Sequence, residues 1–392
     1  MSDEKKPNAA VQLTVLTVSR LFVNTGLRMV YPFLPAFARG LGVPLPVLAS
    51  LVSVRWFASL VSPLFGPLSE RFGRRKILAL SMVLFSLGCL IVVIWPELWA
   101  FGLTLSAVAV AKVIYDPAMQ AYIGDTIPYN KRGRSIAITE LSWAGAFFLG
   151  IPLAGFAIQE QSWWAPFLWL AALGVLAGVA LFRLLAKVDG RSGAVTNLRE
   201  SWHVIRQQPV IWAAATYILL VTAANELILI VYGDWMETSF GLSITSLGLA
   251  TAVIGGAEVT GEITTAIVVD RIGKRPFVIT TGIVTAVMYF LLPNVSVVLV
   301  GALISLFVLF LFFEMTVVGG IPIMTELVPW ARSIVLSVIL AAGGLGRAIG
   351  ALVGPILWTR GDLQLLGLVS AMTMAVATAI MAFWIHEAKG NS

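Results

Sequence analysis

The chain has 392 residues, of which 59% are hydrophobic and 12% are charged, whereas soluble proteins average about 45–50% and about 25%. A water-soluble protein of this composition would expose large apolar surfaces, so the ordinary globular enzyme is excluded. The formal net charge of +6 raises the question of nucleic-acid binding until the cations are located. The single cysteine, Cys89, lies in an apolar run, which excludes an intramolecular disulfide.

Twelve apolar stretches follow one another along the chain. Their centres lie near residues 24, 57, 86, 110, 146, 174, 221, 256, 284, 308, 344 and 374. Each is about 20 residues long, the length that an α-helix needs to cross a bilayer. The first stretch, residues 13–36, carries two arginines and no small-residue cleavage site, so we expect a retained helix. The sequence predicts an all-α membrane protein with twelve transmembrane helices.

The loops on the two sides of the predicted membrane differ in charge. Of the 26 lysines and arginines, 19 fall on the side of both termini and two, Arg39 and Arg360, on the other. Cytoplasmic loops carry the excess of Lys and Arg, so we expect both termini in the cytoplasm and the protein in the cell membrane. Because topology accounts for the basic charge, we expect no nucleic-acid partner.

The two halves of the sequence resemble each other at an offset of about 200 residues. Asn24 aligns with Asn225, Leu48-Ala49 with Leu249-Ala250, and the charged loop 70–75 with 270–275. A near-constant offset at separate places indicates an internal repeat. We therefore expect two pseudo-symmetric six-helix bundles, over residues 1–186 and 209–392, joined by a cytoplasmic linker at 187–208.

Residues 66–75 read GPLSERFGRR, which places a glycine four residues before an acid that is followed by Arg, any residue, Gly, Arg and Arg. With the twelve spans and the 6+6 repeat, this motif resembles the major facilitator superfamily of transporters. The resemblance covers essentially the whole chain and implies two six-helix bundles around a central cavity. The fifth span is similar to the glycine-rich motif of the drug and metabolite proton antiporters in that family, with one residue inserted before the proline. It carries Gly145, Gly150, Pro152 and Gly155.

The charged loop in each half is a candidate conformational latch. An acid beside several cations at a helix end makes charge-assisted hydrogen bonds that can form in one state and break in another. The candidate latch residues are Gly66, Glu70, Arg71, Gly73, Arg74, Asp270 and Arg271. The alternative is that these cations only set the topology and bind anionic lipid headgroups.

Eleven ionisable residues lie inside the predicted spans, where each costs about 2.5–3.5 kcal/mol on insertion scales and needs a partner or a wet cavity. The first half contains four cations and two acids, and the second half contains one cation and four acids. They are Arg20, Arg28, Arg55, Lys112, Asp116 and Glu140, and then Glu226, Glu258, Glu262, Glu314 and Arg347.

The first span carries a polar stripe, because Arg20, Asn24 and Arg28 lie at helical spacing and Tyr31 returns to the angle of Arg20. We expect this stripe to be wet. The candidate substrate-binding residues are Arg20, Asn24, Arg28, Tyr31, Arg55, Tyr115 and Trp143. Such a mixed set suits an amphipathic or zwitterionic small molecule, or a lipid with an anionic headgroup. The alternative is that the arginines snorkel or pair permanently with acids on neighbouring helices.

Five carboxyl groups are candidate proton carriers: Glu140, Glu258, Glu262, Glu314 and Asp116. Glu258 and Glu262 lie four residues apart, and two carboxylates on one helix face do not readily ionise together. Glu140 is placed by helical spacing near the aromatic Trp143, whereas Asp116 ranks lower because Lys112 can hold it ionised. The candidate ion-pair residues are Lys112, Glu226 and Arg347.

We therefore expect a secondary active transporter that works by alternating access, with proton-coupled export of an amphipathic or zwitterionic molecule or lipid. The alternatives are a proton-coupled uptake symporter for a small anionic metabolite and a non-transporting receptor or scaffold. No nucleotide-binding loop is present, and both histidines, His203 and His386, fall in polar segments, so we expect no enzyme, cofactor or metal. The expected partners are the substrate, protons and the lipid bilayer, and a monomer is expected to suffice.

Overall fold

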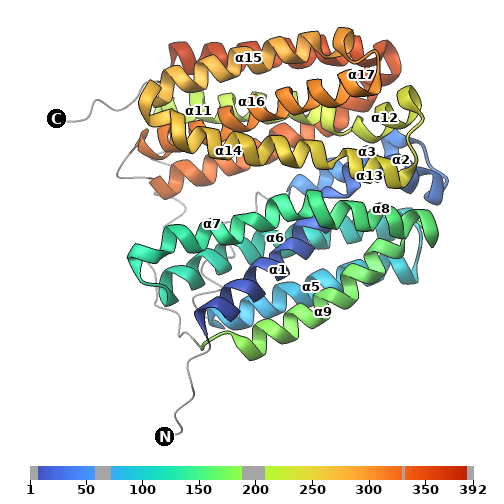
Figure 1. Ribbon diagram of the computed structural model, residues 1–392, viewed down its shortest axis with the longest axis vertical. Coiled ribbons are helices and arrows are strands. Elements are labelled where there is room, and N and C mark those ends of the chain that lie inside the picture. Colours follow the sequence, from blue (N-terminus) through green and yellow to red (C-terminus); the bar gives the residue numbers. More distant parts are fainter. Residues whose placement is uncertain (1–7, 58–71, 188–207, 329–331, 386–392) are drawn as a thin grey trace, which may run out of the picture. The chain divides into compact units, whose positions relative to one another are not determined.

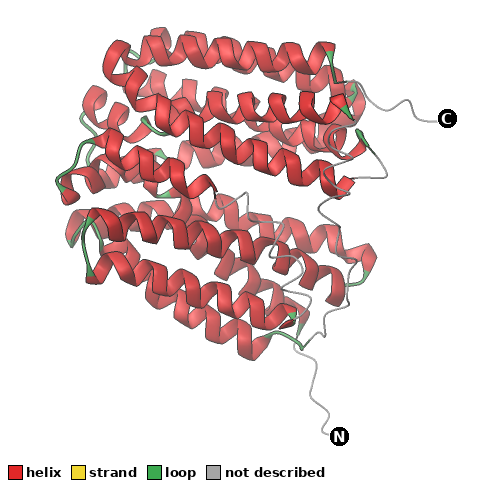
Figure 2. Cartoon of the chain, turned by 180° about the vertical axis from the view of Figure 1, so that it is seen from behind, coloured by secondary structure: helices red, strands yellow, loops and turns green. Residues whose placement is uncertain are grey.

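The computed structural model describes residues 8–57, 72–187, 208–328 and 332–385 (Figure 1). Within these ranges the chain forms helices and no strands (Figure 2). Ten helical stretches there are long and apolar enough to cross a membrane, and the shorter apolar helix Leu45–Trp56 adds to them. One of the ten, Val335–Phe383, breaks at Gly361 and Asp362, where the backbone is not helical. The prediction of an all-α membrane protein is confirmed, and the pattern is consistent with twelve spans.

The helices group into two compact units. Unit 1 contains α1 (Ala9–Arg28), α2 (Val30–Leu41), α5 (Arg74–Ile94), α6 (Leu98–Thr126), α7 (Tyr129–Gly145), the π-helix η2 (Ala146–Gly150), α8 (Ile151–Glu160), α9 (Ala165–Leu184) and α13 (Ile244–Ala250). Unit 2 contains α3 (Leu45–Trp56), α11 (Pro209–Leu229), α12 (Tyr232–Phe240), α14 (Ala252–Ile272), α15 (Lys274–Val295), α16 (Leu299–Glu326) and α17 (Arg332–Phe383). The expected linker falls almost entirely in residues 188–207, outside the described ranges.

Two helices belong to the unit opposite to the one that their place in the sequence suggests. Helix α3 packs on α17 in unit 2, where the hydroxyl of Ser53 donates a hydrogen bond to the carbonyl oxygen of Ala348 at 2.7 Å. Helix α13 lies in unit 1, where a Cβ atom added to Gly248 would stand 3.3 Å from the carbonyl oxygen of Ile151 in α8. The repeat aligns Leu48-Ala49 of α3 with Leu249-Ala250 at the end of α13, so the two halves exchange equivalent segments.

The repeat also recurs in the local backbone of each unit. Gly73 (φ 87°, ψ 135°) precedes α5, and its counterpart Gly273 (φ 93°, ψ 140°) precedes α15. Gly42 and Gly241 end α2 and α12 with φ values of 66° and 64°. Such positive φ angles are readily adopted by glycine because it has no Cβ atom.

Arg75 and Arg275, which are also counterparts in the repeat, each donate a hydrogen bond to the C-terminal end of a long helix in their own unit. Arg75 Nη1 donates to the carbonyl oxygen of Leu185 at 3.3 Å, and Arg275 Nε donates to that of Ile385 at 2.9 Å. The carbonyl groups at a helix end have no partner within the helix. The final arginine of each charged motif therefore caps the C-terminal end of α9 or α17.

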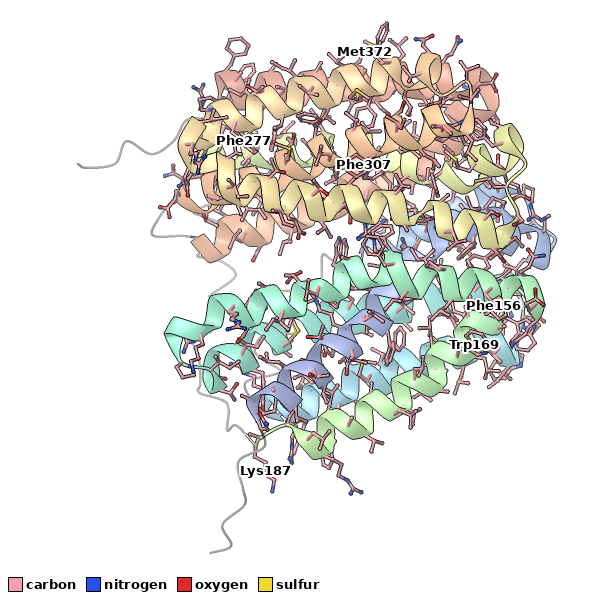
Figure 3. The ribbon with its side chains drawn as sticks, in the orientation of Figure 1. Phe156, Trp169, Lys187, Phe277, Phe307 and Met372 are labelled. Atoms are coloured by element: carbon pink, nitrogen blue, oxygen red, sulfur yellow. The ribbon has the colours of Figure 1, made fainter. Side chains whose placement is uncertain are left out.

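Helix α1 crosses unit 1 in contact with α6, α7, η2 and α9 (Figure 1). Large apolar side chains on both units point away from the protein, as Phe156 and Met372 do with exposed fractions of 49% and 61% (Figure 3). Lipid tails solvate such side chains as well as a protein core does. The exposed apolar surface therefore fits a membrane-spanning protein.

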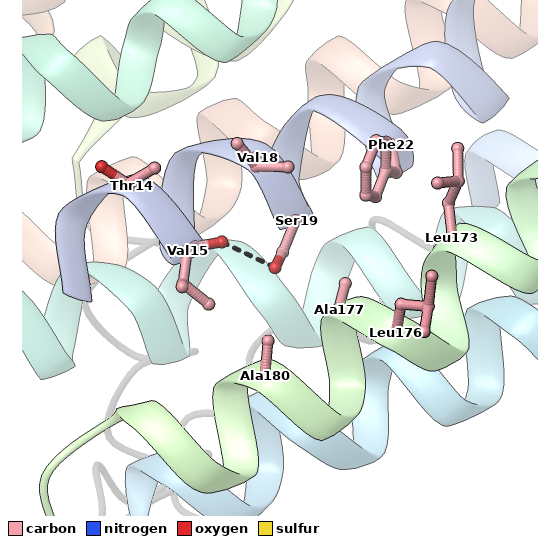
Figure 4. A pocket seen from close by; sticks show the side chains of 9 residues that line it. All are labelled: Thr14, Val15, Val18, Ser19, Phe22, Leu173, Leu176, Ala177 and Ala180. Atoms are coloured by element: carbon pink, nitrogen blue, oxygen red, sulfur yellow. Dashed lines mark hydrogen bonds between the residues drawn. The ribbon is translucent and has the colours of Figure 1, made fainter. Parts of the chain in front are cut away.

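An open pocket of about 310 Å³ lies between α1 and α9 (Figure 4). Its lining is apolar apart from Thr14 and Ser19, and the Ser19 hydroxyl donates to the carbonyl oxygen of Val15 at 2.7 Å. No charged side chain lines this pocket. It is therefore separate from the ionisable residues considered below.

Helices α11 and α17 approach each other at backbone distance through glycines of α17. A Cβ atom added to Gly346 would stand 2.2 Å from the carbonyl oxygen of Leu219, and one added to Gly350 would stand 2.8 Å from that of Ala223. Small residues permit such contacts between membrane helices, and any larger side chain forces the helices apart.

This packing predicts that Gly346→Ala destabilises the protein whereas Gly343→Ala does not. The added methyl group at residue 346 collides with backbone, and overpacking of this kind costs about 1–3 kcal/mol. Gly343 is a matched control in the same helix, because a Cβ atom there meets nothing closer than 3.7 Å. Thermal unfolding of the purified variants in detergent measures the difference. Equal unfolding temperatures for the two variants would contradict the close packing.

Candidate functional site

Four ionisable residues of unit 1 form a connected network between α1, α6 and α7. Arg20 lies at its centre, with Nε 3.0 Å from Asp116 Oδ1 and Nη1 2.7 Å from Glu140 Oε2. Lys112 Nζ lies 2.6 Å from the other oxygen of Asp116. These four side chains carry two positive and two negative charges when all are ionised, so the network is neutral. A charged side chain within a membrane is costly unless a group of opposite charge pairs with it, and each charge in this network has such a partner.

Polar side chains fix the geometry of this network. Asn24 accepts a hydrogen bond from Lys112 Nζ at 2.8 Å and donates one to the Ser142 hydroxyl at 3.2 Å. Arg20 Nη1 also donates to the carbonyl oxygen of Thr139 at 3.2 Å. Helix α7 is therefore held to α1 both by the carboxylate of Glu140 and by hydrogen bonds to Thr139 and Ser142.

The two acids of the network differ in their surroundings. Both oxygens of Asp116 contact cations, one from Arg20 and one from Lys112. The side chain of Glu140 is 39% exposed, against 24% for Asp116. Asp116 is thus locked between two cations, whereas Glu140 is the more accessible acid.

Arg28 contacts two aromatic rings of unit 1. Its guanidinium carbon lies 3.8 Å from the ring centroid of Trp143 and 3.8 Å from that of Phe147. Such contacts stabilise a cation through the electron-rich faces of the rings. Lys112 Nζ lies 5.3 Å from the same Trp143 ring, so two cations of unit 1 lie near one tryptophan.

The π-helix η2 brings Phe147 to this position. The N–H of Ile151 donates to the carbonyl oxygen of Ala146, five residues back, and Pro152 has no N–H to continue a regular ladder. A Cβ atom added to Gly150 would stand 1.9 Å from Thr25 Oγ1 of α1. The Gly-Ile-Pro sequence therefore allows α1 and η2 to approach closely and widens the turn that carries Phe147.

Unit 2 contains a second site between α3, α11 and α17. Arg347 Nη1 lies 3.4 Å from Glu226 Oε2, and the Glu226 side chain is fully buried. The Trp56 ring centroid lies 4.9 Å from the Arg347 guanidinium carbon and 5.3 Å from that of Arg55. Beside Glu226, Asn225 accepts a hydrogen bond from the Tyr289 hydroxyl at 3.2 Å. Unit 2 therefore also contains a tryptophan near two cationic side chains.

Three further carboxyl groups of unit 2 surround the crossing of α14 and α16. A Cβ atom added to Gly261 would stand 3.0 Å from Glu314 Cβ, so Glu314 lies opposite the turn of α14 that carries Glu258 and Glu262. Glu258 is buried, and the other two are partly exposed. These three predicted proton carriers thus gather in one region of unit 2.

The expectation that the polar stripe of α1 is wet is wrong. Arg20, Asn24, Arg28 and Tyr31 are all buried, with exposed fractions between 0% and 7%. The stripe faces α6, α7 and η2, whose polar and aromatic side chains replace water. Tyr115 is buried too, and its hydroxyl donates to the carbonyl oxygen of Leu16 at 2.8 Å.

The predicted latch is only partly within the described ranges. Gly66, Glu70 and Arg71 lie outside them, as do His203 and His386. Arg74 Nε lies 3.2 Å from Asp125 Oδ2 on α6 of the same unit. Asp270 and Arg271 are exposed at the end of α14. No group of three His, Cys, Asp or Glu side chains suited to a metal occurs among the described residues.

Several residues of these sites were missed in the sequence. Trp56 stands next to Arg55, and Ser142 stands two residues after Glu140, so a search for polar and aromatic neighbours of the charged residues would have found both. Tyr289 has no such local signal, since its contact with Asn225 joins residues 64 positions apart.

Comparison with known proteins identifies the family. The family model described as Major Facilitator Superfamily matches residues 16–232 and 216–392. The chain is 24% identical over 336 residues to an uncharacterized MFS-type transporter, YwfA, of Bacillus subtilis, covering 84% of this chain and 81% of the relative. It is 27% identical over 312 residues to the class C tetracycline resistance protein of Escherichia coli, covering 73% and 74% of the two chains. The quinolone resistance protein NorA of Staphylococcus aureus is 22% identical, with 62% and 63% covered.

Solved structures share the fold at low sequence identity. The nucleoside transporter NupG superposes with a TM-score of 0.80 at 14% identity, covering 96% of this chain and all of the other. A D-xylose-proton symporter superposes with a TM-score of 0.77 at 16% identity, covering 98% and 99%. Together with the match of the family model to both halves, these findings show that the chain is a multi-pass membrane protein of the Major Facilitator Superfamily of transporters.

Proposed function

We propose that this protein is a proton-coupled exporter of an amphipathic or zwitterionic small molecule or lipid, working by alternating access from the cell membrane with both termini in the cytoplasm. The observation that carries the proposal is the unequal pairing of the two acids that share Arg20. Glu140 is the accessible acid of this network, and Asp116 is the locked one. We assign proton transfer in unit 1 to Glu140.

A proton on Glu140 would cost the network little, because Arg20 keeps a second counter-ion. The Arg20 Nε contact with Asp116 remains after Glu140 becomes neutral. Breaking a buried ion pair is strongly destabilising when it leaves a charge uncompensated, and Asp116 prevents that outcome. The same proton loosens the hold of α1 on α7, which gives a local change that a transport cycle can use.

The names of relatives support export over uptake. Tetracycline, quinolone and multidrug resistance proteins are among the relatives of the chain. The glycine-rich fifth span, which contains the π-helix η2, adds the antiporter-like motif. Uptake remains the second candidate, since the structural neighbours include a D-xylose-proton symporter.

The assignment of residues follows from their contacts. In unit 1 we assign substrate contact to Arg28 and Trp143, which are in contact with each other; Trp143 follows Glu140 by three residues on α7. In unit 2 we assign it to Arg55, which lies beside Trp56. We instead assign a structural role to Arg20 and Asn24, which make contacts within the ion-pair network of unit 1. Arg347 forms an ion pair with Glu226 in unit 2.

Unit 2 offers a second place for a proton. Glu258, Glu262 and Glu314 share one crossing of α14 and α16, and neighbouring carboxyl groups share protons when like charges would otherwise meet. We rank Glu258 and Glu262 with Glu140, and Glu314 below them. Substitution of each by Gln, which imitates the protonated form, separates these candidates.

Glu140→Gln should abolish gradient-driven accumulation and preserve substrate exchange without a gradient, because a neutral side chain cannot release a proton. The measurement uses proteoliposomes with an imposed pH gradient and a screen of fluorescent amphiphiles and lysolipids. Glu160→Gln, at the exposed end of the same span, is the matched control and should transport normally.

The same vesicles distinguish export from uptake. A proton antiporter accumulates substrate in vesicles with an acidic lumen, and a symporter does so when the outside is acidic. Full accumulation by Glu140→Gln would rule out its coupling role.

Asp116→Asn should lower stability more than Glu140→Gln does. Asp116 contacts both Arg20 and Lys112, and loss of a partner from partly buried charges costs about 1–3 kcal/mol. Glu140→Gln leaves every cation of the network next to Asp116. Thermal unfolding of the purified variants in detergent tests this order. A larger loss for Glu140→Gln would show that the roles of the two acids are reversed.

A further inference from the structure

The pocket between α1 and α9 is a groove with a buried floor and an exposed rim (Figure 4). Its floor includes Ser19 and Ala177, which are 1% and 7% exposed. Its rim includes Val18 and Leu176, which are 44% and 65% exposed. The groove therefore opens onto the apolar outer surface of the two helices, which lipid tails solvate in a membrane.

The groove has the length and the chemistry of a site for one acyl chain. Its lining residues on α1 run from Thr14 to Phe22, a distance of about 12 Å at 1.5 Å per residue. The hydrocarbon of one leaflet is about 15 Å thick, so the groove follows most of the length of a chain in one leaflet. The buried hydroxyl of the lining, that of Ser19, already donates to the carbonyl oxygen of Val15. A hydrocarbon chain in the groove would not deprive this hydroxyl of its partner.

Two cations lie just beyond one end of the groove. Thr14 and Ala180 mark this end (Figure 4). Arg183 follows Ala180 by three residues, in the last turn of α9. Lys187 follows the end of α9 by three residues, at the end of unit 1 where α1 begins (Figure 3). Both cationic side chains are exposed, so an acidic group at this end of the groove can reach them.

A phospholipid matches both parts of this arrangement. One of its chains fits the apolar groove, and its phosphate group lies at the depth where the spans end. Basic side chains at a membrane surface attract anionic lipids. A zwitterionic headgroup carries its own cation next to the phosphate and gains less from Arg183 and Lys187. Charge complementarity therefore favours a phospholipid with a net negative charge.

We infer that the groove between α1 and α9 binds one acyl chain of an anionic phospholipid, whose phosphate group lies at Arg183 and Lys187. The lining of the groove contains none of the residues to which we assign substrate contact or proton transfer. The bound lipid is a component of the folded protein, distinct from the transported molecule. Its binding is independent of the proposed transport function and can be measured without transport.

The test uses phosphatidylcholine vesicles that contain the full chain and a small fraction of one photoreactive lipid. Two probes carry the same diazirine-tagged acyl chain, one on phosphatidylglycerol and one on phosphatidylcholine, and mass spectrometry identifies the crosslinked peptides. The phosphatidylglycerol probe should label the groove residues of the wild-type chain at least about fivefold more than the phosphatidylcholine probe. Equal labelling by the two probes, or no label in the groove, would overturn the inference without the need for any variant.

A first pair of variants tests the headgroup contact. Replacement of both Arg183 and Lys187 by Gln should lower labelling by the phosphatidylglycerol probe to the level of the phosphatidylcholine probe. Lys131→Gln is the matched control, because it removes an exposed cation from α7 of the same unit, and it should leave the labelling unchanged. A folded double variant that retains the preference for phosphatidylglycerol would contradict the role of the two cations.

A second pair of variants tests the position of the chain. Ala180→Phe places a large ring in the groove and should abolish labelling there by both probes. Val179→Phe adds the same ring at the neighbouring position, which is 54% exposed and outside the groove lining, and should be labelled as the wild type is. Persistent labelling of the groove in Ala180→Phe would show that the acyl chain lies elsewhere. Since no proton gradient is used, failure of this test is distinct from failure of proton coupling at Glu140.

Discussion

Arg20 is the residue on which the arrangement of charge in unit 1 depends. A guanidinium group has donors on several nitrogens in a fixed plane, so it can hold two carboxylates at once. Arg20 uses this geometry to join Asp116 on α6 to Glu140 on α7. Because Arg20 retains one acid when the other is neutralised, a proton on Glu140 would leave no unpaired charge within the membrane. The proposed coupling mechanism follows from this shared contact.

The arginines within the helices of the two units make two kinds of contact. Arg20 and Arg347 pair with carboxylates, whereas Arg28 contacts aromatic rings. A carboxylate neutralises the cation, but a ring only offsets part of its desolvation and leaves the charge. The paired arginines therefore suit a structural or coupling role.

Features governed by local spacing were predictable from the sequence. The Lys112–Asp116 pair is such a case, since residues four apart lie on one helix face. The spans and the motif glycines followed from hydropathy and from the repeat, and Gly73 and Gly273 indeed share one unusual backbone conformation.

Contacts between distant segments were not predictable in the same way. Arg20 and Glu140 are 120 positions apart, and helical periodicity gives the face on which a residue lies but not the helix that covers it. For that reason the α1 stripe, expected to be wet, is instead covered by α6, α7 and η2. The placement of α3 in unit 2 and α13 in unit 1 likewise depends on tertiary packing that hydropathy does not encode.

The most direct test of the account is infrared difference spectroscopy of the reconstituted protein as the pH is lowered, which detects protonated carboxyl groups by their C=O stretch. We expect a protonation band that is missing from Glu140→Gln and present in Glu160→Gln, because we propose Glu140 as the acid that exchanges protons in unit 1. If the complete set of bands persists in Glu140→Gln, the proton binds elsewhere and the central role of the Arg20–Glu140 pair is contradicted.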